Sequence, residues 1–401
     1  MFKVVNELNP DCLLVYEASI KLLKNLLTKD GFVASTEDTA NYRRVWGRDG
    51  VVAGLASLVS GNKELIQGFR LTLETLKKYQ DKTGRIASNV DVANNKVSFG
   101  TTVGRVDASI WYVIGVCQYV LVTKDSNVWQ EFEDSVARAF FYLECLELNG
   151  RGLVNIPPGG DWADEYINEG YVLFDQMLYL IAQKLYFKVT KKPDLSEKAD
   201  RLTELIKVNY FPKLENIDSP FVYHQAIFKK AVEDYKPPIP VTYFTSHNIR
   251  YHFDSFASSL LLLTNILDRE DEKMIEQKLM SLADSSLPII PAFYPVIDEN
   301  HPLWGQLTDN YLYEFKNKPY YFHNGGRWPM VHGFFLASFE GSGKNELEAF
   351  ARILREDDCV FHEFYQGQTG EPLGTTGLGF SASGYILSYE KIVNGRLPFL
   401  I

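Results

Sequence analysis

The feature that most constrains the fold is a long series of segments whose apolar residues recur at helical spacing. About twelve such segments follow one another along the chain, whereas the strict alternation typical of strands is rare. The predicted helices cover residues 11–28, 46–60, 62–80, 105–124, 126–147, 171–190, 194–209, 254–267, 270–283, 329–340, 344–356 and 378–394. We therefore predict an all-α protein of about twelve helices.

The links between these segments alternate in length. Short links such as "GN" at 61–62 and "GSGKN" near 341–345 join one helix to the next. The alternate links are mostly long, at roughly 81–104, 148–170, 210–253, 284–328 and 357–377. Helices joined by short loops are antiparallel neighbours, so strict alternation places the long links at one end. A closed ring of six helical hairpins, an (α/α)6 barrel, accommodates every predicted helix.

The chain shows no sign of a domain boundary. No Pro/Ser-rich linker and no abrupt change of charge divides its 401 residues, so we predict a single domain, 1–401. A solenoid of repeated hairpins is disfavoured because the loops differ in length and sequence. Loops on a rigid scaffold usually carry function, so we expect the chemistry at the long-loop end of the barrel.

Composition and charge narrow the possible partners. The formal net charge of −10 argues against nucleic-acid binding, which needs clustered Lys and Arg. No apolar run approaches the length of a membrane span, and "MFKVVNELNPDCLL" lacks the core of a signal peptide. The four cysteines are scattered without a CxxC pair, so we expect neither a disulfide framework nor a zinc site. These features predict a cytoplasmic protein.

The mid-chain stretch "PPGGDWADEY" places three carboxylates around one tryptophan, directly after helix-breaking residues. Asp161, Trp162, Asp164 and Glu165 follow one another here, and Gln176 comes on the next predicted helix. Like charges so close together repel, so we expect at least one carboxyl to hold its proton unusually strongly. Such sites are often catalytic, although a solvated acidic turn remains an alternative interpretation.

Two earlier segments combine charged residues with the predicted start of a helix. "YRRVWGRDG" contributes Trp46, Arg48 and Asp49, and "VGRVDASIW" contributes Asp107. An Arg-Asp pair can hydrogen-bond two sugar hydroxyls from both sides, because Asp accepts and Arg donates. The alternative interpretation is a pair of capped helix starts stabilised by a salt bridge.

Two later segments are rich in aromatic and polar side chains. "YYFHNGGRWPMVHG" gathers His323, Asn324, Arg327 and Trp328 around a Gly-Gly pair, and packing alone explains such a loop poorly. "VFHEFYQGQTGEPLG" sets Glu363 among aromatic residues before a glycine-rich run. Desolvation there can raise a carboxyl pKa, but nearby donors could instead hold Glu363 ionised as a base. Both possibilities stay open at this point.

The sequence lacks motifs typical of phosphate-binding loops, metal sites and serine nucleophiles. "GSGK" at 341–344 lacks the first glycine and the final Ser or Thr of a phosphate loop, and no strand precedes it. The seven histidines show no HExxH spacing, and there is no GxSxG nucleophile elbow. We therefore expect no metal ion and no cofactor.

In this order, the five segments resemble those of the six-hairpin glycosidases, and most nearly the alkaline/neutral invertases and the amylo-α-1,6-glucosidase type of debranching enzyme. "VWGRDGVVAGLA", "VGRVDASIW", "YYFHNGGRWP" and "HEFYQGQTGEPLG...SASGY" resemble invertase blocks in order and approximate spacing. The resemblance spans most of residues 42–390. It implies the six-hairpin barrel and glycoside hydrolysis.

The resemblance also implies roles for particular residues. Such enzymes use an aspartic acid from the mid-chain loop and a glutamate from the C-terminal one. By position, Asp164 matches the general acid and Glu363 the general base, with Asp161 as the alternative acid. The expected substrate-binding residues are Trp46, Arg48, Asp49, Asp107, Trp162, Gln176, His323, Asn324, Arg327 and Trp328.

The expected function is inverting hydrolysis of an α-glycosidic bond, with glucose as the expected sugar and a small carbohydrate as the only expected partner. The invertases carry a basic stretch after their acid where this chain reads "WADEYINEG", so sucrose specificity is not carried over. A glycoside phosphorylase, a sugar epimerase on the same barrel and an inactive carbohydrate-binding protein remain alternatives. The oligomeric state is left open.

Overall fold

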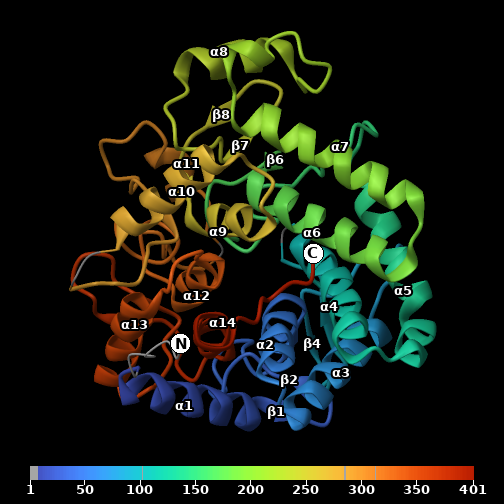
Figure 1. Cartoon of the computed structure of the whole chain (residues 1–401), viewed down its shortest axis with the longest axis vertical. Helices are drawn as coiled ribbons and strands as arrows, with labels where there is room; N and C mark the ends of the chain where they lie inside the picture. The colour runs from blue at the N-terminus through green and yellow to red at the C-terminus, as the bar shows by residue number, and fades with distance from the viewer. Residues whose placement is uncertain (1–7, 102, 284–285, 312) are drawn as a thin grey trace, which may run out of the picture.

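The inner layer of the barrel is a closed ring of six helices (Figure 1). The structure is a computed structural model that describes residues 8–101, 103–283, 286–311 and 313–401. The ring consists of α2 (Gly47–Ser60), α4 (Asp107–Thr123), α6 (Leu173–Thr190), α9 (Ser255–Thr264), α12 (Pro329–Ser338) and α14 (Gly379–Asn394). Each packs on the next in this order, and α14 returns to α2.

Six further helices form the outer layer. They are α1 (Pro10–Leu26), α3 (Lys63–Lys78), α5 (Ser126–Cys145), α7 (Pro193–Tyr210), α10 (Arg269–Leu282) and α13 (Lys344–Glu356). The (α/α)6 barrel is therefore confirmed, and the twelve predicted helices begin and end within a few residues of their predicted bounds.

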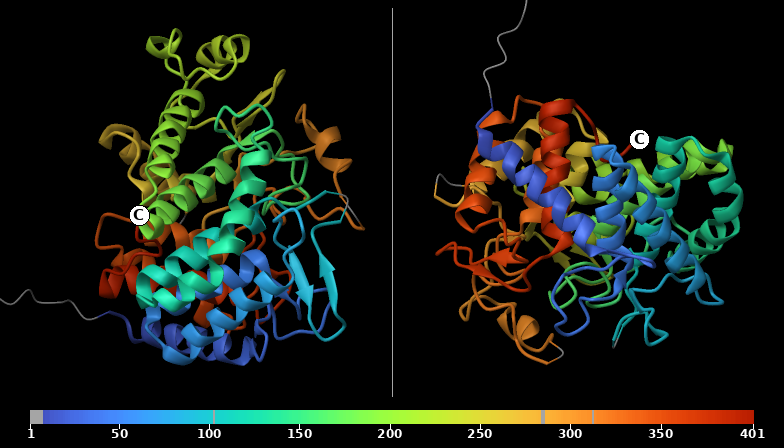
Figure 2. Two further views of the ribbon diagram at one scale, coloured as in Figure 1. Left: turned by 90° about the vertical axis from the view of Figure 1, so that its right-hand side faces the viewer. Right: turned by 90° about the horizontal axis from the view of Figure 1, so that it is seen from below.

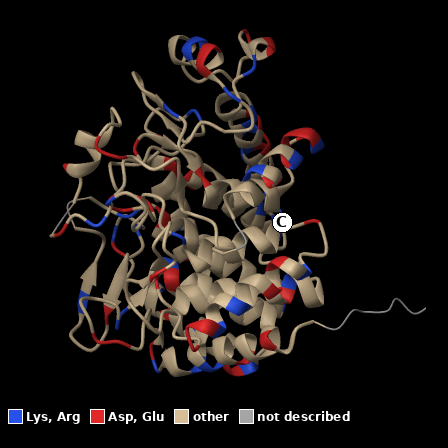
Figure 3. Cartoon of the chain, turned by 90° about the vertical axis from the view of Figure 1, so that its left-hand side faces the viewer, with Lys and Arg blue, Asp and Glu red and all other residues tan. Residues whose placement is uncertain are grey.

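The two layers differ in sequence because they differ in burial. In α9, "SFASSLLLLT", every residue is buried, as in a helix surrounded by protein. In α13, the buried residues recur every three or four positions and form one face, which packs on α1 and α14. Figure 3 shows charged residues on the outer helices and on the links, while the central helices carry few. No helix within the described ranges has both the length and the apolar character needed to cross a bilayer.

The long links contain elements that periodicity did not predict. Two extra helices are α8 (Gln225–Asp234) and α11 (Trp304–Thr308), and Leu214–Asn216 form a 3-10 turn. The short strands are β1 (Leu27–Thr28), β2 (Gly31–Phe32), β3 (Val45–Trp46), β4 (Asn89–Asp91), β5 (Lys96–Ser98), β6 (Tyr171–Val172), β7 (Tyr243–Phe244), β8 (Ile249–Arg250), β9 (Phe253–Asp254), β10 (Phe293–Tyr294), β11 (Phe364–Tyr365) and β12 (Pro372–Leu373).

These strands pair within a long link, as in β1-β2 and β11-β12, or between two links, as in β3-β4, β6-β7 and β9-β10. They pair antiparallel as β1-β2, β3-β4-β5, β6-β7-β8, β9-β10 and β11-β12. The link before α2, residues 27–46, is also long and pairs through β3 with the link before α4. Every inner helix thus begins where a long link ends, so the N-terminal ends of the ring and the long links lie together (Figure 2).

Candidate active site

A cavity of about 570 Å3 lies where the long links meet the N-terminal ends of the inner helices. Its size is typical of a site for a small ligand. Eight of the predicted residues line it: Trp46, Arg48, Asp49, Trp162, Asp164, His323, Trp328 and Glu363. The structure therefore brings Asp164 and Glu363, which are far apart in the sequence, to the wall of one cavity.

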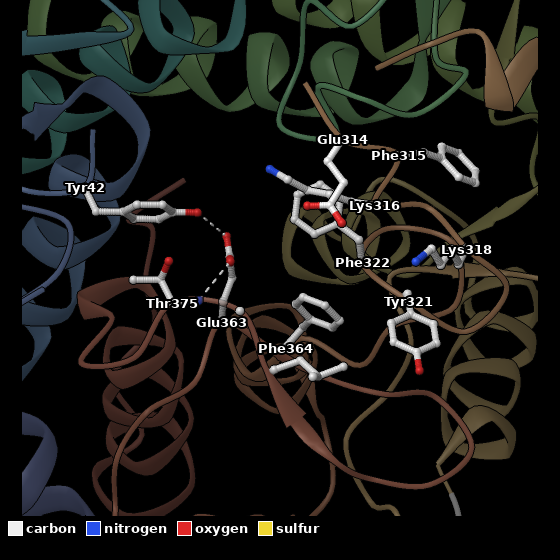
Figure 4. A pocket seen from close by; sticks show the side chains of 12 residues that line it. Tyr42, Glu314, Phe315, Lys316, Lys318, Tyr321, Phe322, Glu363, Phe364 and Thr375 are labelled. Atoms are coloured by element: carbon white, nitrogen blue, oxygen red, sulfur yellow. Dashed lines mark hydrogen bonds between the residues drawn. The ribbon is translucent and has the colours of Figure 1, made fainter. Parts of the chain in front are cut away.

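Glu363 is held by two neutral donors at the edge of β11. The Tyr42 hydroxyl donates to Oε1 at 2.8 Å, and the Thr375 amide donates to Oε2 at 3.3 Å (Figure 4). Burial raises the pKa of Glu363, and these two hydrogen bonds act in the opposite direction. Gly374 makes this close approach possible, because a Cβ there would lie 2.6 Å from Oε2. Both oxygens accept hydrogen bonds, an arrangement that suits an ionised carboxylate.

Glu363 also faces a second cavity, of about 490 Å3. The two cavities share Tyr42, Lys316, Phe322 and Glu363, so they adjoin around this carboxyl group. The second cavity is lined mainly by aromatic rings and by two lysines, as Figure 4 shows. Asp164 lines only the first cavity, so the two carboxyl groups differ in their surroundings.

Asp164 lies on a loop that is held from the segment before α4. Arg105 forms an ion pair with Asp164, Nη2 to Oδ2, at 2.7 Å, and its Nη1 donates to the carbonyl of Gly159. The Val106 amide adds a bond of 2.8 Å to the carbonyl of Gly160. The sequence predicted that at least one carboxyl group of this loop holds its proton strongly, and the structure places the cation of Arg105 at the carboxyl group of Asp164.

Asp161, the alternative acid, lies outside the wall of the cavity. Its side chain is fully buried, and Oδ1 accepts from the Ala163 amide at 3.0 Å while Oδ2 accepts from Asn168 at 2.8 Å. Burial raises the pKa of Asp161 to about 6. Its hydrogen bonds shape the turn before Asp164, and it is not among the described lining residues of this cavity.

Arg48 lies in the cavity wall between two aspartates, and 14% of its side chain is exposed. Its Nη1 lies 2.8 Å from Oδ2 of Asp107, and its Nε lies 3.9 Å from Oδ2 of Asp49. Burial opposes the charge, but Asp107 and Asp49 outweigh it and raise the pKa of Arg48. Asp107 itself does not line the cavity. Its observed contact is with Arg48, and that Asp107 binds the sugar stays a prediction.

The side chains of three more predicted residues form hydrogen bonds with backbone groups. Gln176 exchanges two bonds of 2.9 Å with the backbone of Val154, and Asn324 exchanges two of 2.8 Å with Ile297. Arg327 donates to the carbonyls of Leu282, Leu287, Ile289 and Gly367. None of the three lines the cavity among the described residues. Irregular loops carry backbone groups that need partners when buried, and these side chains supply them.

An aromatic cluster forms the base of the cavity. Trp162 meets Trp328 edge to face at 5.6 Å between ring centroids and His323 at 4.9 Å. His323 and Trp328 stack in parallel at 5.0 Å. Burial lowers the pKa of His323, and Arg48 acts in the same direction, so this imidazole is neutral. Flat apolar rings beside charged groups suit the faces and hydroxyls of a sugar.

The comparisons with solved structures agree on the fold. The GH63 mannosylglycerate hydrolase from Thermus thermophilus, in complex with Tris, matches with a TM-score of 0.65 at 12% identity, over 93% of this chain and 99% of that protein. A rhamnosidase from Klebsiella oxytoca matches with a TM-score of 0.62 at 12% identity, over 98% of this chain and 66% of that one. The chain has the six-hairpin glycosidase fold.

Sequence relatives point the same way, although no protein-family model matches the chain. The probable alkaline/neutral invertase F of Arabidopsis thaliana is 21% identical over 88% of this chain and 81% of its own length. Cytosolic invertase 1 of Oryza sativa subsp. japonica is 22% identical over 89% of this chain and 73% of its own length. Together with the six-hairpin glycosidase fold, these relatives support glycoside hydrolase activity.

The six-hairpin glycosidase fold also brings residues to the site that the motifs did not single out. They are Tyr42, Arg105, Glu165, Lys316 and Phe322. Tyr42, Arg105 and Glu165 stand inside the motifs described above, so the sequence shows their functional groups. It does not show the direction in which each side chain points. Burial raises the pKa of Glu165, whose Oε1 lies 3.9 Å from Lys316. Within the described ranges, no set of His, Cys, Asp and Glu side chains is arranged to hold a metal ion.

Proposed function

We propose that the protein is an inverting glycoside hydrolase acting on an α-glycosidic bond of a small carbohydrate. The observation that carries the proposal is that Asp164 and Glu363, from two different links, line one cavity whose base is aromatic. Inverting glycosidases need two carboxyl groups on opposite sides of the scissile bond, with room between them for a water molecule.

Asp164 protonates the departing glycosidic oxygen as the bond from that oxygen to the anomeric carbon breaks. Glu363 takes a proton from the attacking water, whose oxygen bonds to the same carbon from the opposite face. Arg105 then stabilises the Asp164 carboxylate left by proton transfer, as in the observed ion pair. An ionised carboxylate has about four lone-pair sites. Tyr42 and Thr375 each use one of those of Glu363, so lone pairs remain for the attacking water.

Arg48 and Asp49 are proposed to hold hydroxyl groups of the sugar in the cleavage subsite, with Trp46, Trp162 and Trp328 as walls. Glucose is the proposed sugar, in keeping with the invertase names of the relatives. The GH63 mannosylglycerate hydrolase from Thermus thermophilus has also been solved in complex with glucose. We propose a cytoplasmic location and a reaction without a cofactor.

The alternatives fit the cavity less well. A phosphorylase would bring phosphate to the face of the sugar where Glu363 stands, and the two anions would repel. An epimerase that uses histidines as acid and base needs two of them, and among the described lining residues His323 is the only one. These contrasts favour hydrolysis by water.

A panel of α-linked disaccharides, including sucrose and trehalose, tests the proposal. Proton NMR of the first released sugar should show the β-anomer, which then mutarotates, and turnover should not require phosphate. Initial release of the α-anomer would contradict inversion. Turnover only in the presence of phosphate would replace hydrolysis with phosphorolysis.

A further inference from the structure

Asn317 joins two loops of the site through an uncharged, fully buried side chain. Its Nδ2 donates to the carbonyl of Glu165 at 2.6 Å, and its Oδ1 accepts from the amides of His323 and Asn324 at 3.0 and 3.2 Å. Its own carbonyl accepts from Nδ2 of Asn324 at 3.0 Å. One residue thus ties the loop of Asp164 to the loop of His323.

The bond to Glu165 falls one residue after the proposed acid. Arg105 holds the opposite side of Asp164 through that carboxyl itself and through the Gly159 carbonyl. The loop is therefore held from both sides of Asp164, by Arg105 before it and by Asn317 after it. A shift of about 1 Å in a catalytic group can cost about a hundredfold in rate.

We propose that Asn317 is a positioning residue that sets where Asp164 meets the glycosidic oxygen. The inference rests on the proposed function, with Asp164 as the acid. The side chain must donate at one end and accept at the other, which an amide does and a carboxylate does not. Asn317→Asp keeps the two bonds from His323 and Asn324 but turns an oxygen toward the Glu165 carbonyl. This substitution therefore isolates the contact with the loop of Asp164.

The test compares two substrates of the same sugar. One is a disaccharide from the panel, whose leaving group needs a proton. The other is the α-glycosyl fluoride, whose fluoride leaves without one. For Asn317→Asp we expect kcat on the disaccharide to fall about tenfold to a hundredfold, while kcat on the fluoride falls less than about threefold. KM should change little for either. The ratio of the two rates does not depend on how much of the variant is folded.

The matched control is Asn209, in α7. It is also a buried asparagine whose Nδ2 donates to a carbonyl, that of Phe221 at 2.9 Å, and whose Oδ1 accepts from the Tyr223 amide at 2.8 Å. It does not line the cavity among the described residues. We expect both Asn209→Asp and Asn317→Asp to lower the melting temperature, but Asn209→Asp should leave the ratio of rates on the two substrates at the wild-type value.

Equal losses on both substrates, or more than half of the wild-type kcat on the disaccharide, would overturn the positioning role of Asn317. Asp164→Asn, measured on the same pair, separates this from the proposed function. If Asp164→Asn also lowers both rates equally, the assignment of Asp164 as the acid fails. If Asp164→Asn leaves the rate on the glycosyl fluoride nearly unchanged while Asn317→Asp lowers it, only the inference about Asn317 fails.

Discussion

At the scale of single residues, the two carboxyl groups of the cavity have different kinds of partner. Glu363 accepts from a hydroxyl and an amide, while Asp164 faces the guanidinium of Arg105. Neutral donors favour the ionised form of Glu363 without cancelling its charge, which suits a base. The Arg105 contact places a cation beside the proposed acid. Both contacts are accessible to substitution.

The contact of Tyr42 with Glu363 predicts a shift in pH dependence. Its hydroxyl opposes the rise in the pKa of Glu363 caused by burial. Tyr42→Phe removes this donor, so the pKa rises further and a higher pH is needed to ionise the base. A hydrogen bond to a charged group contributes about 1.5–3 kcal/mol, so the acidic limb of kcat/KM should move up by about one pH unit or more.

The control for Tyr42→Phe is Tyr16→Phe. Tyr16 donates to Oε1 of Glu390 at 2.5 Å, outside the cavity wall, so its removal should leave the pH profile in place. An acidic limb that stays at the wild-type pH in Tyr42→Phe would contradict the role of Glu363 as the base.

The site residues show where sequence reasoning works and where it fails. Trp46, Arg48 and Asp49 stand at the start of a helix that follows a long link, so their place near the cavity follows from the order of elements. Asn324 and Arg327 stand in an equally polar loop, yet they bind backbone groups. Whether a buried polar group faces a ligand or a carbonyl depends on partners distant in the sequence, which local patterns do not contain.

At the scale of elements, acidic residues gather where inner helices begin. Asp49, Asp107 and Asp175 lie in the first turns of α2, α4 and α6, and Asp254 caps α9. Helix N-termini favour negative charge, but burial disfavours it. Burial raises the pKa of Asp175 well above its usual range, and the neighbouring aspartates add to the effect. Burial also raises the pKa of Asp49, and that of Asp254 to about 7, so these two groups and Asp175 resist ionisation.

Asp254 predicts a pH-dependent change in stability. Burial raises its pKa to about 7 in the folded protein, against about 3.9 in the unfolded chain. The folded state therefore holds a proton that the unfolded state releases, and stability falls as the pH rises between these values. Asp254→Asn keeps an acceptor for the amides of Phe256 and Ala257 and removes the titration. The variant should gain in melting temperature over wild type more at pH 8 than at pH 4.5.

The control for Asp254→Asn is the exposed cap of α10. Asp268 accepts from the amides of Glu270 and Asp271, and its pKa is lowered, first by the bond from Asp271. Its ionised form therefore stabilises the fold above the unfolded pKa, so Asp268→Asn should lose slightly more stability at pH 8 than at pH 4.5. Identical pH trends in the two variants would contradict the account of the buried cap.

Helical elements were predictable because their apolar spacing extends over three or more turns. The strands of two or three residues are too short to show alternation, and α8 and α11 lie inside links that read as irregular. The pairing of β3 with β4 joins residues more than forty positions apart, and tertiary contacts rather than local preference determine it. Of these unpredicted pieces, β3, β4 and β5 contribute residues to the cavity wall.

At the scale of the whole molecule, the barrel depends on close contact around its ring. α12 and α14 approach so closely that a Cβ on Gly333 would lie 2.2 Å from the carbonyl oxygen of Gly384. The first and last helices, α1 and α14, are joined by the Tyr385 hydroxyl, which donates to the Cys12 carbonyl at 3.0 Å. Closure of the ring brings five of the six long links to the wall of one cavity, and the link 211–254 contributes no described residue to it. That residues 1–401 behave as a single domain stays a prediction.

Gly333→Ala should therefore destabilise the protein strongly. An added methyl group with no space forces the backbones apart, and overpacking of this kind costs about 1–3 kcal/mol or more. Denaturant unfolding should show a lower midpoint than wild type. Gly305→Ala, in α11, is the control, because a Cβ there meets nothing within 4 Å. Equal midpoints for the two variants would contradict the close contact of α12 with α14.

The central claim is that Asp164 and Glu363 carry out the chemistry together. The most direct measurement is the rate of sugar release by Asp164→Asn and Glu363→Gln, each with its melting temperature, beside Asp161→Asn. The account predicts that the first two variants stay folded and lose nearly all hydrolysis, while Asp161→Asn, altered outside the cavity wall, loses less. A folded Asp164→Asn or Glu363→Gln that keeps more than about a tenth of the wild-type rate would contradict it, since loss of acid or base catalysis alone costs about 10²–10⁴-fold.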